Sequence, residues 1–349
     1  MVLQAPAQPT TVEAPPAHPD APSPGQRPEP STERRSLRRR LRAPAIATVV
    51  VQAVLAMGDR MPSVDATAYF ATGRNVLEGA GYTRHGAPEM HFPPVAPIGY
   101  ALGERLLGSE MAALRVLHLT AGLACVVLLV ALAKLLSEDD DVVVATAWLA
   151  TTVGGLVCLA IRGGSGSELL TVDLLLGAAL VALGGPARAS MSGGRLAGRA
   201  AAVGALVGIA YLTRPEALVP GLLLGLPATH VRHQPRRTLV GLAAFAVVLG
   251  ALVAPYVAFQ HAHTGSWALT SKSQDASIEA WRSVAEGDRR ARDEVLYAID
   301  DTGTGLGSET RSLTTLARED PAGWLGIVAT NAATIGRWYL LAQLLPLFL

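Results

Sequence analysis

The chain has 349 residues, of which 50% are hydrophobic and 16% are charged, whereas ordinary soluble domains carry about 25% charged residues. Its mean hydropathy is +0.34, and several apolar runs approach or exceed the roughly 20 residues that cross a bilayer as a helix. This composition argues against a soluble enzyme and against a disordered chain. Lys and Arg number 29 and Asp and Glu number 28, which gives no sign of a nucleic-acid partner. The two cysteines have neither disulfide nor metal-ligand spacing.

Residues 1–42 are predicted to be a disordered, Pro-rich cytoplasmic tail that ends in a basic anchor. Nine of the 23 prolines fall in the first thirty residues, and such a segment buries too little apolar surface to offset its ordering entropy. Six arginines follow between positions 34 and 42. Because an apolar run starts directly after them, the positive-inside rule favours the cytoplasmic end of an uncleaved first span over a patch for nucleic acid or anionic lipid.

The segment 43–349 is predicted to be all-α, a polytopic transmembrane helical bundle with about seven spans and a partial eighth. The predicted spans cover residues 43–58, 116–136, 142–161, 169–183, 200–213, 217–228, 239–259 and 324–349. Two short basic loops, around Arg195 and Arg236, lie on the same side as the N-terminus, as cytoplasmic loops should. We therefore expect a multi-pass protein of the plasma (inner) membrane with a cytoplasmic N-terminus. Its long outer loops are then 59–115 and 260–323.

Polar residues of the first outer loop surround a predicted surface helix. Asp65 opens this weakly amphipathic helix, and Gly79 and Gly81 end it. From its position alone, Asp65 is either a helix N-cap or a functional carboxylate. The Pro93-Pro94 step after His91 indicates a rigid, extended entry to the next element.

Two further outer segments also concentrate polar residues. Arg162 and Glu168 flank a Gly/Ser stretch, which is either a flexible turn or backbone that approaches a ligand closely. Asp173 follows about one turn into the next span, where an acid is costly and is a functional candidate by default. The third segment contains Arg214 and Glu216. The glutamate suits a helix N-terminus, whereas the guanidinium suits a phosphate at the membrane surface, with snorkelling as the alternative.

Taken in order, these motifs resemble the GT-C class of membrane glycosyltransferases, in the group of protein mannosyltransferases and aminoarabinose transferases. The resemblance covers most of the chain after the tail. It is carried by Asp65 to Tyr69, Gly79 to Gly81, Pro93-Pro94 with Pro97, Ser167-Glu168, Leu212-Thr213-Arg214-Pro215-Glu216 and Pro255-Tyr256. Two positions depart from the family pattern, because many relatives have a second acid at Ala66 and a lysine at Phe92.

The resemblance implies a GT-C-type bundle that moves a sugar from a polyprenyl-phosphate donor to an extracytoplasmic acceptor hydroxyl, with inversion. The family's loop aspartate is the general base on the acceptor, and it maps onto Asp65. Arg214 is the first candidate to stabilise the departing lipid phosphate, with Arg162 or Arg84 next.

A second carboxylate of the family maps onto Glu168 or Asp173, and we prefer Glu168 because it lies nearer the surface. The remaining expected substrate-binding residues are Tyr69, His91 and Glu216.

The expected partners are the lipid bilayer, the lipid-linked sugar donor and an acceptor that is a glycan, a lipid or a protein. No cofactor is predicted, and a divalent metal ion stays open because some relatives bind one and no convincing ligand spacing is present. Two other hypotheses stay open. One is a transporter or flippase for a lipid-linked or anionic solute, although no internal repeat is evident. The other is an inactive, truncated relative, because the chain stops within its eighth predicted span.

Overall fold

A computed structural model describes residues 36–57, 63–152, 166–185, 190–231, 233–265, 267–270 and 317–344. Nearly all regular structure in these residues is helical. The exception is a short antiparallel hairpin of β1 (Thr83–Arg84) and β2 (Ala87–Pro88). Most of the predicted tail, Arg162 and most of the predicted outer loop 260–323 lie outside the described residues.

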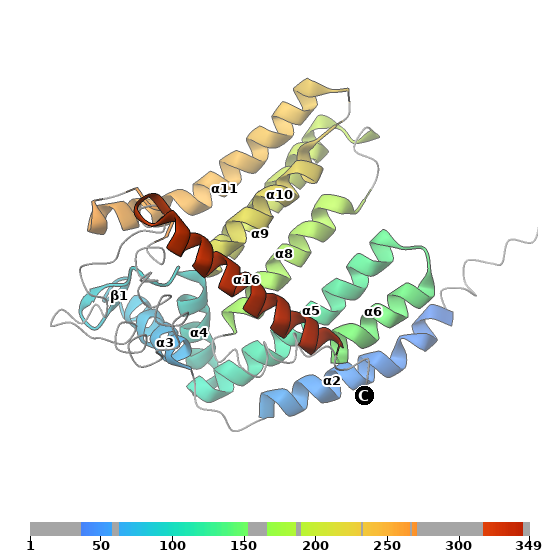
Figure 1. Ribbon diagram of the computed structural model, residues 1–349, viewed down its shortest axis with the longest axis horizontal. Helices are drawn as coiled ribbons and strands as arrows, with labels where there is room; N and C mark the ends of the chain where they lie inside the picture. Colours follow the sequence, from blue (N-terminus) through green and yellow to red (C-terminus); the bar gives the residue numbers. More distant parts are fainter. Residues whose placement is uncertain are drawn as a thin grey trace, which may run out of the picture. The chain divides into compact units, whose positions relative to one another are not determined.

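The described chain from Leu41 onward belongs to one compact unit, which is built from helices (Figure 1). Its helical elements are α2 (Arg42–Met57), α3 (Val64–Leu77), α4 (Val95–Leu107), α5 (Glu110–Leu136), α6 (Asp140–Thr152), α8 (Ser167–Leu183), α9 (Gly193–Thr213), the 3₁₀ turn η2 (Pro215–Ala217), α10 (Leu218–Thr229), α11 (Pro235–Thr264) and α16 (Pro321–Leu344). The element α4 falls inside the segment that we predicted as outer loop, and α5 begins before the predicted start at 116.

Four described helices are long and apolar enough to cross a membrane, and these are Ser36–Met57, Glu110–Leu136, Gly193–Thr213 and Pro235–Thr264. They indicate a membrane protein and coincide with four of the predicted spans. Of the other predicted spans, those described as α6, α8 and α10 are shorter, whereas α16 has 24 residues and overlaps the predicted span 324–349. With a rise of 1.5 Å per residue, α8 extends about 26 Å and α10 about 18 Å, against a hydrocarbon core of about 30 Å. The description of α6 stops at Thr152, within the predicted span 142–161.

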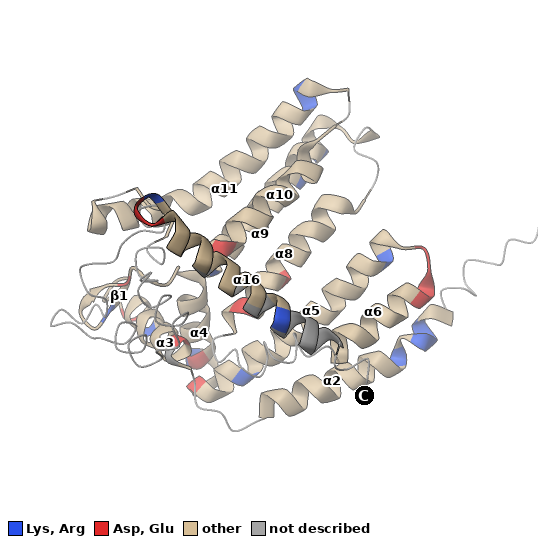
Figure 2. Ribbon diagram, viewed as in Figure 1, with Lys and Arg blue, Asp and Glu red and all other residues tan. Residues whose placement is uncertain are grey.

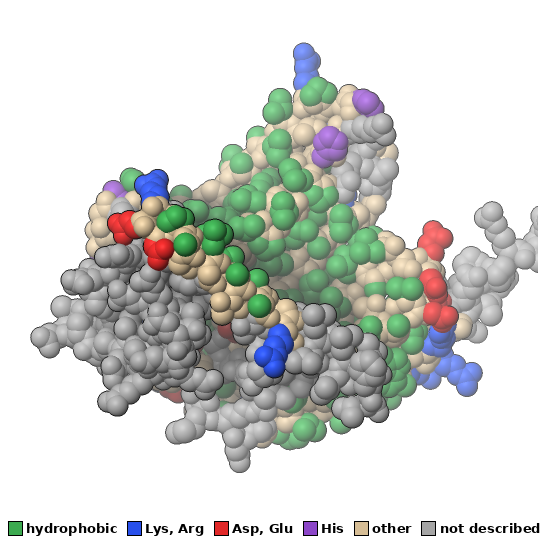
Figure 3. Space-filling view, in the orientation of Figure 1, with side chains coloured by type: hydrophobic (Ala, Val, Ile, Leu, Met, Phe, Trp, Pro, Cys, Tyr) green, Lys and Arg blue, Asp and Glu red, His purple; other side chains and the backbone are tan. Residues whose placement is uncertain are grey.

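Large apolar side chains remain exposed along these helices. Only 17% of the most apolar stretch of Pro235–Thr264 is buried, compared with 50% for Gly193–Thr213. The α9 helix is therefore the inner helix of its group, while α11 presents most of its surface outward. Figure 3 shows hydrophobic side chains spread over the helices in view. Exposed apolar residues include Leu223 on α10 and Val247 on α11. Exposed apolar surface of this extent favours contact with lipid.

The helices α8 and α9 run antiparallel. Arg214, directly after α9, contacts Glu168 in the first turn of α8, whereas Arg199, near the start of α9, contacts carbonyl groups at the end of α8. We name the two ends of the bundle the Arg214 end and the Arg199 end after these residues. The start of α11 lies at the Arg199 end, because Arg237 donates a hydrogen bond to the carbonyl of Met191.

Small residues allow α9 and α11 to pack closely. A Cβ atom on Gly204 would lie 2.6 Å from the carbonyl oxygen of Phe245, and one on Gly208 would lie 2.8 Å from the side chain of Leu252. Glycines four residues apart on one helix face permit this approach of two backbones within a membrane. The core around this contact consists of small and branched side chains from α8, α9, α10 and α11, together with the ring of Phe245.

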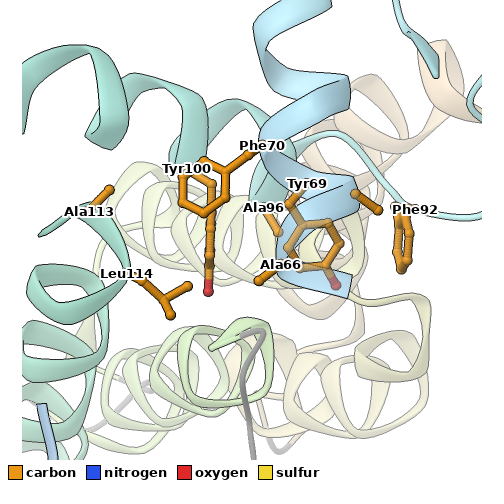
Figure 4. Close-up of a cluster of buried hydrophobic side chains, with 9 residues drawn as sticks. Ala66, Tyr69, Phe70, Phe92, Ala96, Tyr100, Ala113 and Leu114 are labelled. Atoms are coloured by element: carbon orange, nitrogen blue, oxygen red, sulfur yellow. The ribbon is translucent and has the colours of Figure 1, made fainter. Parts of the chain in front are cut away.

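A second core joins α3, α4 and the start of α5 (Figure 4). The ring of Tyr69 lies edge-on to Phe92 and to Tyr100, with centroids 4.7 and 5.5 Å apart. Phe70 packs edge-on against the same Tyr100 ring at 5.3 Å. The predicted helix at Asp65 is confirmed as α3, but its side chains at 66 and 68–70 are buried in this core. This packing fixes α3 against the Arg214 end, because Tyr69 also contacts α8.

Candidate functional site

Asp65 lies in the first turn of α3, but it is not the cap of that helix. Ser63 is the N-cap, and its hydroxyl accepts a hydrogen bond of 3.1 Å from the backbone N–H of Ala66. The interpretation of Asp65 as an N-cap is therefore wrong. The Asp65 side chain is half-buried, and none of the residues that the structure describes donates a hydrogen bond to its carboxylate. Helix capping thus leaves this carboxylate available for chemistry, at a helix end where negative charge is favourable.

Tyr69 lies one turn after Asp65 and connects α3 to α8. Its hydroxyl is 3.2 Å from the hydroxyl oxygen of Ser167, the first residue of α8. Burial raises the pKa of Tyr69 above its ordinary value, and this outweighs the lowering effect of the contact with Ser167. Tyr69 therefore stays a neutral hydroxyl at physiological pH. This single contact joins two segments that are 98 residues apart in the sequence.

Arg214 occupies the break between α9 and η2, where its backbone is extended. Its Nη1 atom donates to Glu168 Oε1 at 2.5 Å and to Ser167 Oγ at 3.3 Å, and its Nη2 atom donates to Glu216 Oε1 at 3.4 Å. Burial alone would lower the pKa of Arg214, but the adjacent carboxylates, Glu168 foremost, raise it above its ordinary value. The guanidinium is therefore a permanent positive charge.

These contacts bring five of the predicted site residues together. Asp65 lies close enough to interact electrostatically with both Tyr69 and Arg214, and Glu168 interacts with the same two residues. Glu216 completes the set from the turn after α9. The cluster contains one guanidinium, three carboxylates and a tyrosine hydroxyl. We call Asp65, Tyr69, Glu168, Arg214 and Glu216 the Arg214 cluster.

Arg84 and His91 belong to a different arrangement, centred on buried Glu89. The Glu89 carboxylate accepts hydrogen bonds from Arg84 Nε at 2.5 Å and from the backbone N–H groups of His91 at 2.7 Å and Phe92 at 3.2 Å. The guanidinium of Arg84 also lies 5.7 Å from the centre of the Phe92 ring. Arg84 is thus engaged in holding the loop that leads into α4.

Sequence reasoning did not identify Glu89 as an organising residue. The available signal was its place shortly before the Pro93-Pro94 step, where backbone N–H groups have no helical acceptors and a carboxylate can satisfy them. Tyr82 adds to the same loop by donating a 2.6 Å hydrogen bond to the carbonyl of Phe92.

Asp173 lies apart from Arg214, five residues beyond Glu168 and thus about 7.5 Å further along α8. Its side chain faces the thiol of Cys125 on α5, and its buried Oδ1 atom has no hydrogen-bond partner among the described residues. Of the two acids that sequence reasoning offered as the second carboxylate, Glu168 contacts Arg214. Arg162 lies outside the described residues, so its position relative to the cluster is not described.

The Arg214 cluster combines a cation and a hydroxyl donor with proton-accepting carboxylates. Such a set suits a ligand that carries both an anionic group and a hydroxyl that loses its proton. In the part of the chain that the structure describes, no group of three or more His, Cys, Asp or Glu side chains is arranged to hold a metal ion.

Comparison of the chain with family models, with curated proteins and with solved structures finds no match. A functional interpretation therefore depends on the residues of the site and on the motifs that the sequence contains.

Proposed function

We propose that this protein is an integral-membrane glycosyltransferase of GT-C type that uses a polyprenyl-phosphate-linked sugar donor. The observation that supports this most is that Tyr69, one turn after Asp65, and Arg214 both contact Ser167, which brings Asp65 within electrostatic reach of Arg214. A carboxylate without a hydrogen-bond donor among the described residues and a permanent cation are the two groups that such a transfer requires. They come from segments that are far apart in the sequence.

In the proposed reaction an acceptor hydroxyl attacks the anomeric carbon of the donor sugar from the face opposite the phosphate. The bond between that carbon and the phosphate oxygen breaks, so the configuration inverts. Asp65 takes the proton of the attacking hydroxyl, which leaves the glycosidic oxygen neutral. The lipid phosphate leaves with an additional negative charge, which Arg214 stabilises. Glu168 acts through Arg214, because its carboxylate orients the guanidinium.

The distribution of basic residues supports an extracytoplasmic site. The Arg199 end carries Lys134, Arg199 and Arg237, which lie at the end of α5 and at the starts of α9 and α11. Figure 2 shows such charges gathered toward the ends of the helices. Under the positive-inside rule this end faces the cytoplasm of a plasma (inner) membrane. The Arg214 cluster then faces outward, where a lipid-linked donor and an acceptor glycan, lipid or protein can meet.

The substitution Asp65→Asn tests this proposal. Membranes that contain the full chain are supplied with a panel of radiolabelled polyprenyl-phosphate sugars, and transfer is measured. We expect the asparagine variant to lose about 10²- to 10⁴-fold in transfer rate, the usual contribution of a general base. Glu78→Gln is the matched control, because it removes an exposed carboxylate at the other end of α3 and should leave transfer unchanged. Transfer retained by Asp65→Asn would refute the assignment of the base.

One observation favours a transporter or flippase as the second candidate function. Asp173 places a carboxylate within the helical bundle against Cys125, and acids at such depth commonly line ion or substrate pathways. If this hypothesis holds, Asp173→Asn abolishes movement of a fluorescent lipid-linked sugar across reconstituted vesicles, and Asp65→Asn does not. If the transferase hypothesis holds, Asp65→Asn abolishes sugar transfer and Asp173→Asn does not. Parallel measurements on the two variants therefore separate the two functions.

A further inference from the structure

The segment after α11 exposes two large apolar side chains. Gly265 ends α11 in the left-handed conformation (φ 72°), and Trp267 and Leu269 follow with exposures of 73% and 51%. Tryptophan is highly buried on average in soluble proteins, so an indole with this exposure requires an explanation. Neither residue belongs to the Arg214 cluster, and the proposed reaction uses neither of them.

Trp267 lies on the outward face of α11. Its indole stacks on the ring of His261, with centroids 4.0 Å apart and ring planes 10° apart. The helical period places His261 on one face with Val247, Ala254 and Ala258. These three residues are exposed, whereas the face of α11 that packs against α9 is buried. Trp267 therefore extends the outward, apolar face of this helix, which is the face expected to contact lipid.

The register of α9 and α11 gives the depth of the stacked rings. Both helices run from the Arg199 end to the Arg214 end, and the ring of Tyr211, two residues before the end of α9, lies 6.3 Å from that of Tyr256 on α11. Since His261 follows Tyr256 by five residues, it lies three residues, or about 5 Å, beyond the end of α9. The helix α9 extends about 32 Å, which matches a hydrocarbon core of about 30 Å, and each headgroup layer adds about 5–7 Å. His261 and Trp267 thus lie at the level of the headgroups.

A buried tyrosine of α9 holds the backbone of the same segment. The hydroxyl of Tyr211 donates a hydrogen bond to the carbonyl of Leu269. Non-helical backbone close to lipid needs such a partner within the protein, because hydrocarbon offers none. In water the carbonyl would be solvated without this contact. The hydrogen bond therefore lets the backbone of the segment lie near the hydrocarbon boundary while the side chains of Trp267 and Leu269 stay exposed.

We propose that residues 267–270 anchor the end of α11 in the headgroup layer of the leaflet at the Arg214 end, with the indole of Trp267 inserted among the lipids. An indole suits this layer, because its apolar body and single N–H donor match a boundary between hydrocarbon and water. The segment 267–270 has no charged residue, so its partner is a phospholipid surface irrespective of headgroup charge. The anchor does not depend on the proposed sugar transfer. It fixes the depth of Arg214, which directly follows α9, whatever ligand that arginine binds.

Depth-dependent quenching of tryptophan fluorescence tests the anchor. The full chain is reconstituted in phosphatidylcholine vesicles whose lipids carry bromine either near the headgroup or at the ends of the acyl chains. The chain has five tryptophans, and the difference between wild type and Trp267→Phe reports Trp267 alone. We expect bromine near the headgroup to quench this difference signal most, and acrylamide in the water to quench it less than it quenches free tryptophan. The Tm should not change, because the substituted side chain is exposed.

Trp148→Phe is the matched control. Trp148 is 40% exposed on α6 and lies about 12 Å from the start of that helix, which is at the Arg199 end. Its signal should be quenched most by bromine at the chain ends. Strong quenching of Trp267 by acrylamide and by neither lipid would place the segment in water and overturn the anchor. Quenching of Trp267 at the depth of Trp148, or protection from every quencher, would overturn it as well, because the ring would then lie in the membrane core or under another part of the protein.

Discussion

Two arginines lie at opposite ends of α8 and have different hydrogen-bond partners there. At the C-terminal end, Arg199 donates from Nε to the carbonyl of Val181 at 2.7 Å and from Nη2 to that of Ala182 at 2.9 Å, and it also contacts the carbonyl of Gly184. The last carbonyls of a helix lack partners within the helix, and the dipole there is negative. A cation at this end both donates hydrogen bonds to these carbonyls and is attracted by the negative end of the dipole. Local helix chemistry therefore accounts for Arg199.

Arg214 lies at the other end, where the dipole of α8 opposes a positive charge. Its partners there are the side chains of Ser167, Glu168 and Glu216, and no backbone carbonyl among the described residues accepts a hydrogen bond from its guanidinium. A partly buried ion pair of this kind is weak evidence for stability, because desolvation offsets much of the attraction. The comparison teaches that local helix chemistry, which accounts for Arg199, does not account for Arg214. In the proposed function Arg214 is explained by the phosphate that it stabilises.

The largest expected effect that separates the two arginines is on catalysis. Arg214→Ala should lower sugar transfer about 10²- to 10³-fold, because the departing phosphate loses its charge partner. The Tm should change little, since the variant leaves Glu168 at a helix N-terminus, where a carboxylate is favourable. Transfer by purified wild type and variant, with Tm measured on the same samples, checks this. Arg214→Lys should restore transfer in part, because it keeps the charge and loses the fork of donors. A large loss of Tm with unchanged transfer would make Arg214 a structural residue like Arg199.

Arg199→Ala should give the opposite pattern. The carbonyl groups of Val181 and Ala182 lose their donor, and each unsatisfied buried group costs about 1–3 kcal/mol. Water at the membrane surface recovers part of this, so we expect a loss of about 2 kcal/mol in unfolding free energy. Transfer per folded molecule should not change. Thermal unfolding of the variant in detergent measures the first quantity, and activity normalised to folded protein measures the second. If Arg199→Ala reduced sugar transfer per folded molecule, Arg199 would not be a purely structural residue, and the contrast with Arg214 would be refuted.

The sequence predicted where the helices of the Arg214 end lie better than it predicted the side-chain contacts between them. The apolar periodicity and the two glycines located α3, and the apolar runs located the four long helices. The pairing of Arg214 with Glu168 was not predictable in this way, because it depends on the antiparallel packing of α8 and α9. The sequence motifs assigned both residues to one predicted site on the outer face, but they did not indicate which charges contact each other.

The starts and lengths of the predicted spans also differ from those of the helices in the structure. Hydropathy marks where apolar segments occur, but it does not fix where a helix starts. Ser109 caps α5 and extends that helix to Glu110, several residues before its apolar run. In α10 the apolar segment is present, yet the helix has 12 residues and does not reach across a bilayer at the usual rise per residue. The start of a helix such as α5 therefore depends on a capping contact that a hydropathy scan does not register.

The smallest expected effect concerns the division of roles between Ser63 and Asp65. Ser63→Ala removes the side-chain acceptor of the Ala66 N–H group and should cost about 1 kcal/mol, the usual value for an N-cap. Sugar transfer per folded molecule should remain near that of wild type, because Ser63 positions the helix and does not touch the substrate. Asp65→Asn should show the reverse, with intact stability and lost transfer. Thermal unfolding and transfer measured on both variants check this division. Equal loss of transfer in the two would mean that the order of the first turn of α3, and not the carboxylate, limits the reaction.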